Sequence, residues 1–160
     1  ALLEFLDARG IEHRTVAKGD TIDLGHAELR ILHPPRGFEP RQENDASLVA
    51  RLVPDDPAAP TMLLTGDIQD EAMAMLMTSG VDLSAGALEL PHHGSARDAA
   101  YAFVRAVDPR VVLQSTGPER LDDPRWDHVR AGRVWLATPR FGAVRPDLRT
   151  DGTIEAGPVR

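Results

Sequence analysis

The feature that most constrains the fold is a regular alternation of short apolar segments and amphipathic segments in the second half of the chain. The apolar segments predict strands at residues 61–65, 87–90, 111–114 and 133–137. The segments between them predict helices at 68–78, at about 97–107 and near 126–130. Strand–helix alternation is typical of α/β proteins, in which helices pack on the faces of a sheet.

The first half of the chain predicts antiparallel strands, because its apolar residues alternate with period two. The predicted elements there are a helix at 2–9 ended by Gly10, a short strand at 11–16, a hairpin of strands 21–24 and 27–32, and a strand at 47–53. A final hairpin is expected at 141–154, with Asp151-Gly152 at its turn. We therefore expect one α/β domain over residues 1–160, with a mixed sheet flanked by helices.

Composition limits the chemistry that the chain can perform. There is no cysteine, so disulfides and thiolate metal sites are excluded, and any metal must use His, Asp, Glu or backbone ligands. No segment approaches the roughly 18 apolar residues that read as a membrane span. The formal net charge is −7, so no general basic field attracts nucleic acid, and a DNA substrate would have to be held locally.

Asp67 lies where a predicted strand ends. The stretch Leu-Leu-Thr-Gly-Asp at 63–67 runs out of an apolar strand and into the next predicted helix. Loops at the carboxyl ends of strands are where α/β proteins bind ligands. The alternative is that Asp67 caps the helix, as an Asp before a helix commonly does. Both interpretations are open at this point.

His92 and His93 follow the next predicted strand, in the stretch Pro-His-His-Gly-Ser at 91–95. Imidazole is the commonest metal-binding side chain, and of two adjacent histidines one is expected to face a given metal. The alternative is a solvated loop in which Ser95 caps the following helix. A right-handed crossover would place Asp67 and this loop at one edge of the sheet, which predicts half of a zinc or manganese site.

These two motifs, preceded by Asn-Asp-Ala-Ser-Leu-Val at 44–49, resemble the metallo-β-lactamase-like domain at the C-terminus of ComEC-type DNA internalisation (competence) proteins. The resemblance covers nearly all of the chain but only about the C-terminal half of that αββα sandwich, so the chain is expected to be a partial domain whose N-terminal half lies upstream. It implies a hydrolase with two divalent metal ions, bridged by Asp67. It also implies one of His92 and His93 as a metal ligand. We expect His93 to be the ligand and His92 to be a catalytic contact, either to the substrate or to the groups around the metal ligands.

The chain departs from that family in two places. The His-x-Asp-x-Asp-His motif of the family is absent: the one Asp-His pair is Asp127-His128, and Arg125 stands where the motif needs an Asp. A His-Pro pair of similar domains is replaced here by Asp123-Pro124. We expect Asp123 to be a solvated loop carboxylate, although it could bind metal or water.

The resemblance implies a metal-dependent phosphodiesterase or nuclease that acts on DNA during uptake. The domain itself is expected to be soluble and to reach the cell membrane through the membrane channel part of the parent protein. Two alternatives are open: a degenerate, non-catalytic module of such a protein, and a hydrolase of another small phosphoester. His33 is expected to be structural, and Trp126 and Trp135 are expected to fill the core or a groove.

Overall fold

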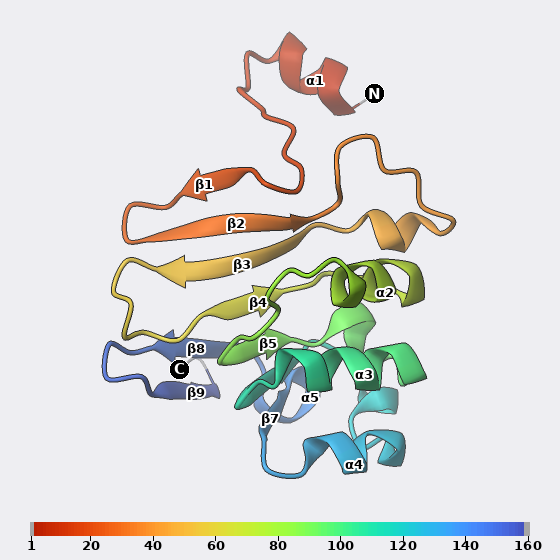
Figure 1. The fold of residues 1–160 in the computed structure, drawn as a ribbon, viewed down its shortest axis with the longest axis vertical. Helices are drawn as coiled ribbons and strands as arrows, with labels where there is room; N and C mark the ends of the chain where they lie inside the picture. The colour runs from red at the N-terminus through yellow and green to blue at the C-terminus, as the bar shows by residue number, and fades with distance from the viewer. Residues whose placement is uncertain (1, 159–160) are drawn as a thin grey trace.

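A seven-stranded mixed sheet forms the centre of the computed structural model, which describes residues 2–158 (Figure 1). Its strands lie side by side in the order in which they occur in the sequence. They are β1 (Thr21–Asp23), β2 (Ala27–His33), β3 (Val49–Pro54), β4 (Met62–Leu64), β5 (Ala87–Glu89), β6 (Val111–Gln114) and β7 (Val134–Ala137). Pairing is antiparallel from β1 to β4 and parallel from β4 to β7.

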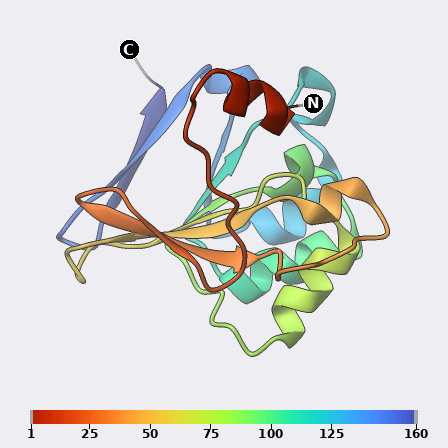
Figure 2. The same cartoon turned by 90° about the horizontal axis from the view of Figure 1, so that it is seen from above.

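The helices α2 (Asp70–Thr78) and α3 (Asp98–Val107) lie on one face of this sheet, a second, smaller sheet lies on the other, and α1 (Leu2–Ala8) buries none of its residues (Figure 2). The other helices are α4 (Asp127–Arg130) and α5 (Thr138–Phe141). The strands β8 (Val144–Leu148) and β9 (Ile154–Pro158) form an antiparallel hairpin. Figure 2 shows α2 and α3 on one side of the sheet and this hairpin on the other. Among residues 2–158, no helix is long and apolar enough to cross a lipid bilayer.

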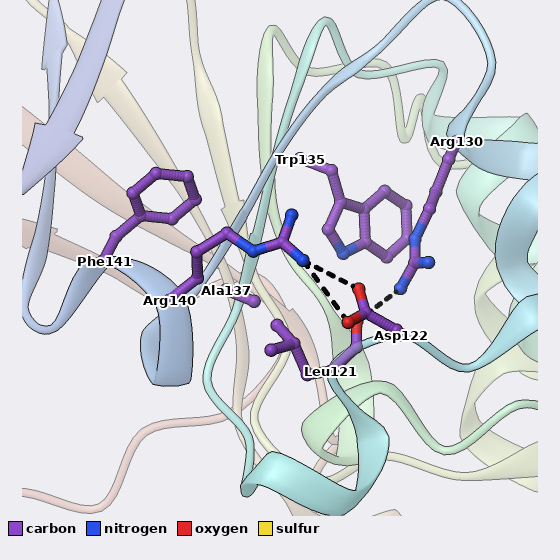
Figure 3. A pocket seen from close by; sticks show the side chains of 7 residues that line it. All are labelled: Leu121, Asp122, Arg130, Trp135, Ala137, Arg140 and Phe141. Carbon is purple, nitrogen blue, oxygen red and sulfur yellow. Dashed lines mark hydrogen bonds and ion pairs between the residues drawn. The ribbon is translucent and has the colours of Figure 1, made fainter.

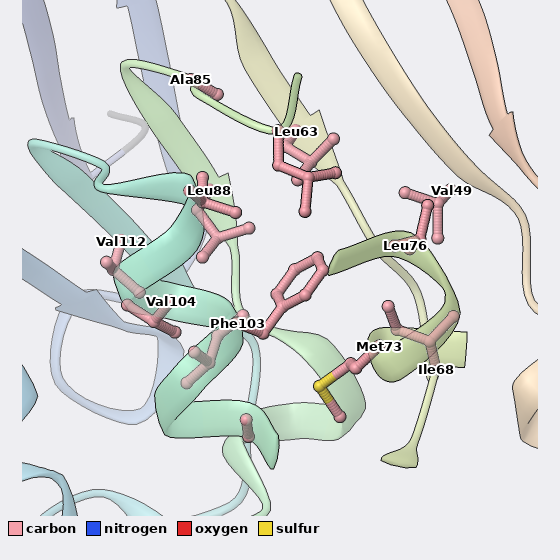
Figure 4. Packing of buried hydrophobic residues seen from close by; sticks show 14 of the residues in the cluster. Val49, Leu63, Ile68, Met73, Leu76, Ala85, Leu88, Phe103, Val104 and Val112 are labelled. Atoms are coloured by element: carbon pink, nitrogen blue, oxygen red, sulfur yellow. The ribbon is translucent and has the colours of Figure 1, made fainter. Parts of the chain in front are cut away.

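The central strands are buried on both faces, and their side chains alternate between two cores. Leu63, Leu88 and Val112 face the helices and pack with residues of α2 and α3, including Met73 and Phe103 (Figure 4). The preceding residues on the same strands, which are Met62, Ala87 and Val111, belong to a second cluster that also holds Val144, Leu148 and Ile154 of the hairpin. Period-two alternation places successive side chains on opposite faces, so both layers are needed to cover this sheet.

Most of the predicted elements are confirmed, including the strand–helix alternation, the first and last hairpins and the α/β class. The predicted strand at 11–16 is wrong. Residues 11–15 are exposed and pair with no strand of residues 2–158, so this segment runs without a regular element towards Ala17, which is buried. The predicted helix at 68–78 begins slightly later, at Asp70, and Ile68 is buried just before it.

The first turn of α2 is capped by a carboxylate from a distant loop. Oδ1 of Asp45 accepts hydrogen bonds from the backbone N–H groups of Gln69 (2.7 Å) and Ala72 (3.1 Å), and Asp45 is only 2% exposed. The carbonyl of Asp45 accepts a hydrogen bond from Nε2 of the buried His33 at 2.7 Å, in agreement with the expected structural role of His33. The interpretation of Asp67 as the helix cap is therefore wrong, because the helix starts at Asp70 and Asp45 accepts two of the N–H groups at its start.

We predict that Asp45→Ala lowers the free energy of unfolding by about 2–4 kcal/mol, because two buried N–H groups lose a charged acceptor. Asp56→Ala is the control: Asp56 also accepts a backbone N–H, from Ala58 at 2.9 Å, but it is exposed. Its loss should cost less than about 1 kcal/mol. Urea unfolding at neutral pH measures both, and equal losses would contradict the remote cap.

Candidate metal-binding site

Three polar loops meet at one edge of the main sheet. Asp67 follows β4, the turn Pro91–Gly94 follows β5, and Ser115 follows β6. These strands are parallel neighbours, so their carboxyl ends share an edge. A backbone hydrogen bond from the N–H of His92 to the carbonyl of Gly66, at 3.0 Å, joins the first two loops directly.

The side chain of His93 connects the second loop to the other two. Its Nδ1 lies 2.9 Å from the carbonyl oxygen of Ser115, which can only accept, so Nδ1 carries the proton. In the neutral ring Nε2 then has a free lone pair, and this atom lies 3.4 Å from Oδ1 of Asp67. The two side chains are 54% and 41% exposed, so the pair is open to solvent. The predicted proximity of Asp67 and the histidine loop is confirmed.

A lone pair and a carboxylate oxygen at this distance repel each other unless a positive charge lies between them. That charge can be a proton on Nε2, which makes a plain ion pair, or a metal ion. Two ligands of one tetrahedral zinc, with bonds of about 2.0–2.2 Å, lie about 3.3–3.5 Å apart. The separation of 3.4 Å fits this geometry. A metal-bound histidine also usually donates its other ring N–H to a carboxylate, a backbone carbonyl or water, as His93 does to the Ser115 carbonyl.

The described residues do not form a complete metal site. Within residues 2–158, no group of three or more His, Asp or Glu side chains converges on one point. A catalytic zinc usually has about three protein ligands and a water. Asp67 and His93 are therefore compatible with two ligands of such a site, and they do not form a complete one.

The turn that carries the histidines has an unusual backbone. His92 and His93 have φ angles of 48° and 55°, and Gly94 follows at 77°, so three successive residues are left-handed. For a residue other than glycine this conformation costs roughly 1–2 kcal/mol. The turn is held by neighbours, among them the buried indole of Trp126, whose Nε1 donates to the carbonyl of Gly94 at 2.9 Å.

The two histidines have different surroundings. His92 is half-buried, and its Nε2 lies 3.5 Å from Nδ2 of Asn44. Its carbonyl accepts a hydrogen bond from the Arg120 guanidinium at 3.3 Å. His93 is the one beside Asp67, as expected, whereas the catalytic role of His92 stays a prediction. In the sequence Asn44 stands only as part of a motif, and its position against His92 is not predicted from it.

Glu89 is a residue that the sequence analysis missed. Its Oε2 accepts hydrogen bonds from the backbone N–H groups of Thr65 (3.2 Å) and Gly66 (3.4 Å), which lie directly before Asp67. Glu89 therefore helps to fix the loop that presents Asp67. The available signal was a single charged residue between the apolar Leu88 and Leu90 of a short strand.

The expectation that Asp123 is a solvated loop carboxylate is wrong. Its side chain is 11% exposed and lies 2.7 Å from the Arg125 guanidinium, and its Oδ1 accepts the backbone N–H of Arg125 at 3.0 Å. The hydrogen bond from the Arg125 side chain is the main cause that holds the pKa of Asp123 below its usual 3.8. His128 belongs to the one Asp-His pair of the sequence, Asp127-His128. Its ring packs edge-on against Tyr101, with 4.8 Å between ring centroids.

No protein-family model matches the chain. The chain is 25% identical over 156 residues to the ComE operon protein 3 of Bacillus subtilis (strain 168). The alignment covers 96% of this chain and 19% of that protein, so the chain spans about a fifth of the length of this relative. The similarity therefore extends over both the sheet and the candidate site.

We predict that Gly94→Ala destabilises the protein by about 2–4 kcal/mol, through a left-handed backbone and overpacking together. A Cβ at Gly94 would lie 2.8 Å from Cδ2 of Leu90 and would also meet the side chain of Gln114. Gly132 is a matched control, because its φ is 78° and no atom lies within 4 Å of an added Cβ. Gly132→Ala should cost about 1–2 kcal/mol. Chemical denaturation that gives the same loss for both variants would show that the turn is not crowded.

Proposed function

We propose that this edge of the sheet is part of a metal-dependent hydrolase site that cleaves phosphodiester bonds of DNA during uptake. The observation that carries the proposal is the environment of His93. Its Nδ1 donates to the Ser115 carbonyl, and its Nε2 is directed at the Asp67 carboxylate at the spacing of two ligands of one metal ion. The finding that Asp67 does not cap α2 supports the same role, because the carboxylate is left available.

In this proposal Asp67 and His93 hold metal, with Asp67 bridging two ions, and His92 contacts the substrate. The remaining ligands would come from the N-terminal half of a metallo-β-lactamase-type domain, outside residues 2–158. The donor set of oxygen and nitrogen suits zinc or manganese. When bound, such ions polarise a phosphoryl oxygen and activate water for attack. The chain's own part is to orient both ligands from two strand ends.

The biological setting is a proposal as well. The similarity to the ComE operon protein 3 supports a place in competence, and the ComEC-type resemblance implies DNA as the substrate and a membrane channel as another part of the same protein. A chain with a net charge of −7 gains little from general attraction to DNA. Bound cations at the site would provide the local positive charge that a phosphodiester needs.

A second candidate function is a non-catalytic module of the same kind of protein. Two observations favour it. Only two potential ligands come together among the described residues, and the Asp123 carboxylate is ion-paired with Arg125. A hydrolase of a smaller phosphoester is a third possibility, which uses the same residues and differs only in substrate. Activity on DNA compared with small phosphodiesters separates these candidates.

We predict that the 160-residue chain alone binds zinc or manganese weakly, because two protein ligands are fewer than the roughly three of a catalytic zinc site. Isothermal titration should give no tight stoichiometric binding, and His93→Gln should remove the weak binding that remains. Tight binding that survives His93→Gln would mean that other residues hold the metal.

We predict that Asp67→Asn in the complete protein reduces metal-dependent DNA cleavage by at least about 100-fold, because an amide lacks the charge of a bridging ligand. Asp70→Asn is the matched control: it makes the same change three residues later, at an exposed carboxylate 3.4 Å from Arg97. It should leave cleavage within about twofold of the parent activity. Thermal melts without metal should be similar for both variants. Full activity of Asp67→Asn would remove the metal role.

A further inference from the structure

We propose that Asn44 is a positioning residue of the candidate site, which holds the His92 ring so that its Nδ1–H is left for the substrate. The inference deepens the proposed function and rests on it for the role of His92. The contact that carries it joins Nδ2 of Asn44 to Nε2 of His92, at 3.5 Å. The amide nitrogen can only donate, so Nε2 accepts the hydrogen bond and Nδ1 carries the proton of the neutral ring.

The turn that carries Asn44 is fixed by contacts that do not involve its side chain. It is a short 3₁₀ helix at Glu43–Ala46, and the N–H of Ser47 closes it by donating to the Asn44 carbonyl at 3.0 Å. The next residue, Asp45, is buried, caps the start of α2 with its carboxylate and binds His33 through its carbonyl. The Asn44 amide is therefore presented by a rigid turn and is not needed to hold that turn together.

The same segment also packs against the loop that presents Asp67. Gly66 has a φ angle of 52°, and a Cβ added there would lie 3.3 Å from Cβ of Ser47. The carbonyl of Gly66 in turn accepts the backbone N–H of His92 at 3.0 Å. Residues 44–47 therefore contact both loops of the candidate site, one through Ser47 and the other through Asn44.

A second segment holds the backbone of His92. Nη1 of Arg120 donates to the His92 carbonyl at 3.3 Å. Arg120 is followed by Leu121, whose carbonyl accepts a hydrogen bond from Arg130 at 2.9 Å, and both Leu121 and Arg130 line a pocket (Figure 3). These contacts fix the main chain and leave the imidazole free to rotate about its side-chain bonds. Among residues 2–158, only Asn44 hydrogen-bonds to the His92 ring.

This arrangement makes His92 a hydrogen-bond donor to the substrate and not a general base. The lone pair of Nε2 faces the Asn44 amide, so Nε2 can take a proton from water only if that contact breaks. Nδ1 has no hydrogen-bond partner within residues 2–158, and its N–H can donate to a phosphoryl oxygen that gains negative charge during attack. At 3.5 Å the amide contact is long and adds little to stability, so its main effect is on the ring itself.

The test is the tautomer of the His92 ring, measured by ¹⁵N NMR of the 160-residue chain in EDTA at about pH 9, where imidazole is neutral. The signals that disappear in His92→Gln identify the ring. The parent chain should show mainly the Nδ1–H form. Asn44→Asp replaces the donor by an acceptor and should make the Nε2–H form dominant, and Asn44→Ala should lower the ratio of Nδ1–H to Nε2–H at least about threefold. Gln42→Ala is the matched control, because it removes an exposed amide from the same turn, and should leave the ratio unchanged.

Thermal melts and kinetics separate positioning from a structural role. Asn44→Ala should melt within about 2 °C of the parent chain. In the complete protein it should lower kcat for DNA cleavage about tenfold or more and change KM less than about twofold. An unchanged tautomer in both Asn44 variants, an equal change in Gln42→Ala, or full kcat of Asn44→Ala would overturn the proposal. The NMR measurement needs neither metal nor substrate, so it decides the role of Asn44 even if the complete protein does not cleave DNA.

Discussion

The short parallel strands β4, β5 and β6 are buried on both faces, and this burial determines where polar chemistry can occur in the molecule. Leu63, Leu88 and Val112 are covered by the helices, and Met62, Ala87 and Val111 are covered by the β8–β9 hairpin. The helices and the hairpin cover most of both faces, and a pocket lined by Met62, Leu64 and Leu113 is left on the hairpin side. Charged and polar side chains are accommodated at the strand ends, and the parallel order brings those ends together at one edge.

Buried polar groups then set the shape of that edge. The Asp45 carboxylate accepts hydrogen bonds from two backbone N–H groups at the start of α2. The Trp126 indole N–H donates a hydrogen bond to the carbonyl of Gly94. Each interaction satisfies a backbone group that would be costly to leave unpaired. They also fix the two loops that carry Asp67 and His93. The left-handed backbone of the histidine turn is unfavourable by itself. Contacts from residues outside the turn, such as Trp126, hold it in place.

The positive charges that could contact an anionic ligand are local, because the chain as a whole carries a net negative charge. The chain carries seven more acidic than basic groups, yet arginines gather where polar loops leave the sheet. Arg120 contacts the histidine turn, and Arg130 and Arg140 line the neighbouring pocket. An anionic ligand would gain short-range contacts with these groups, and general attraction would contribute little.

The sequence alone determined the order and type of most elements and the two motifs of the candidate site. Period-two and helical periodicity are local properties, and so are the strand ends at Asp67 and His92-His93. Tertiary structure decided what each polar side chain does. Asp67 could be read as a helix cap until Asp45, distant in sequence, was found to take that role, and Asp123 was expected to be solvated although it pairs with Arg125. The strand expected at 11–16 failed for the same reason, since a strand needs a partner and none of the described strands lies beside it. Hydrogen-bond partners, strand partners and the tautomer of His93 depend on groups that the chain brings close only when it folds, and no local pattern encodes them.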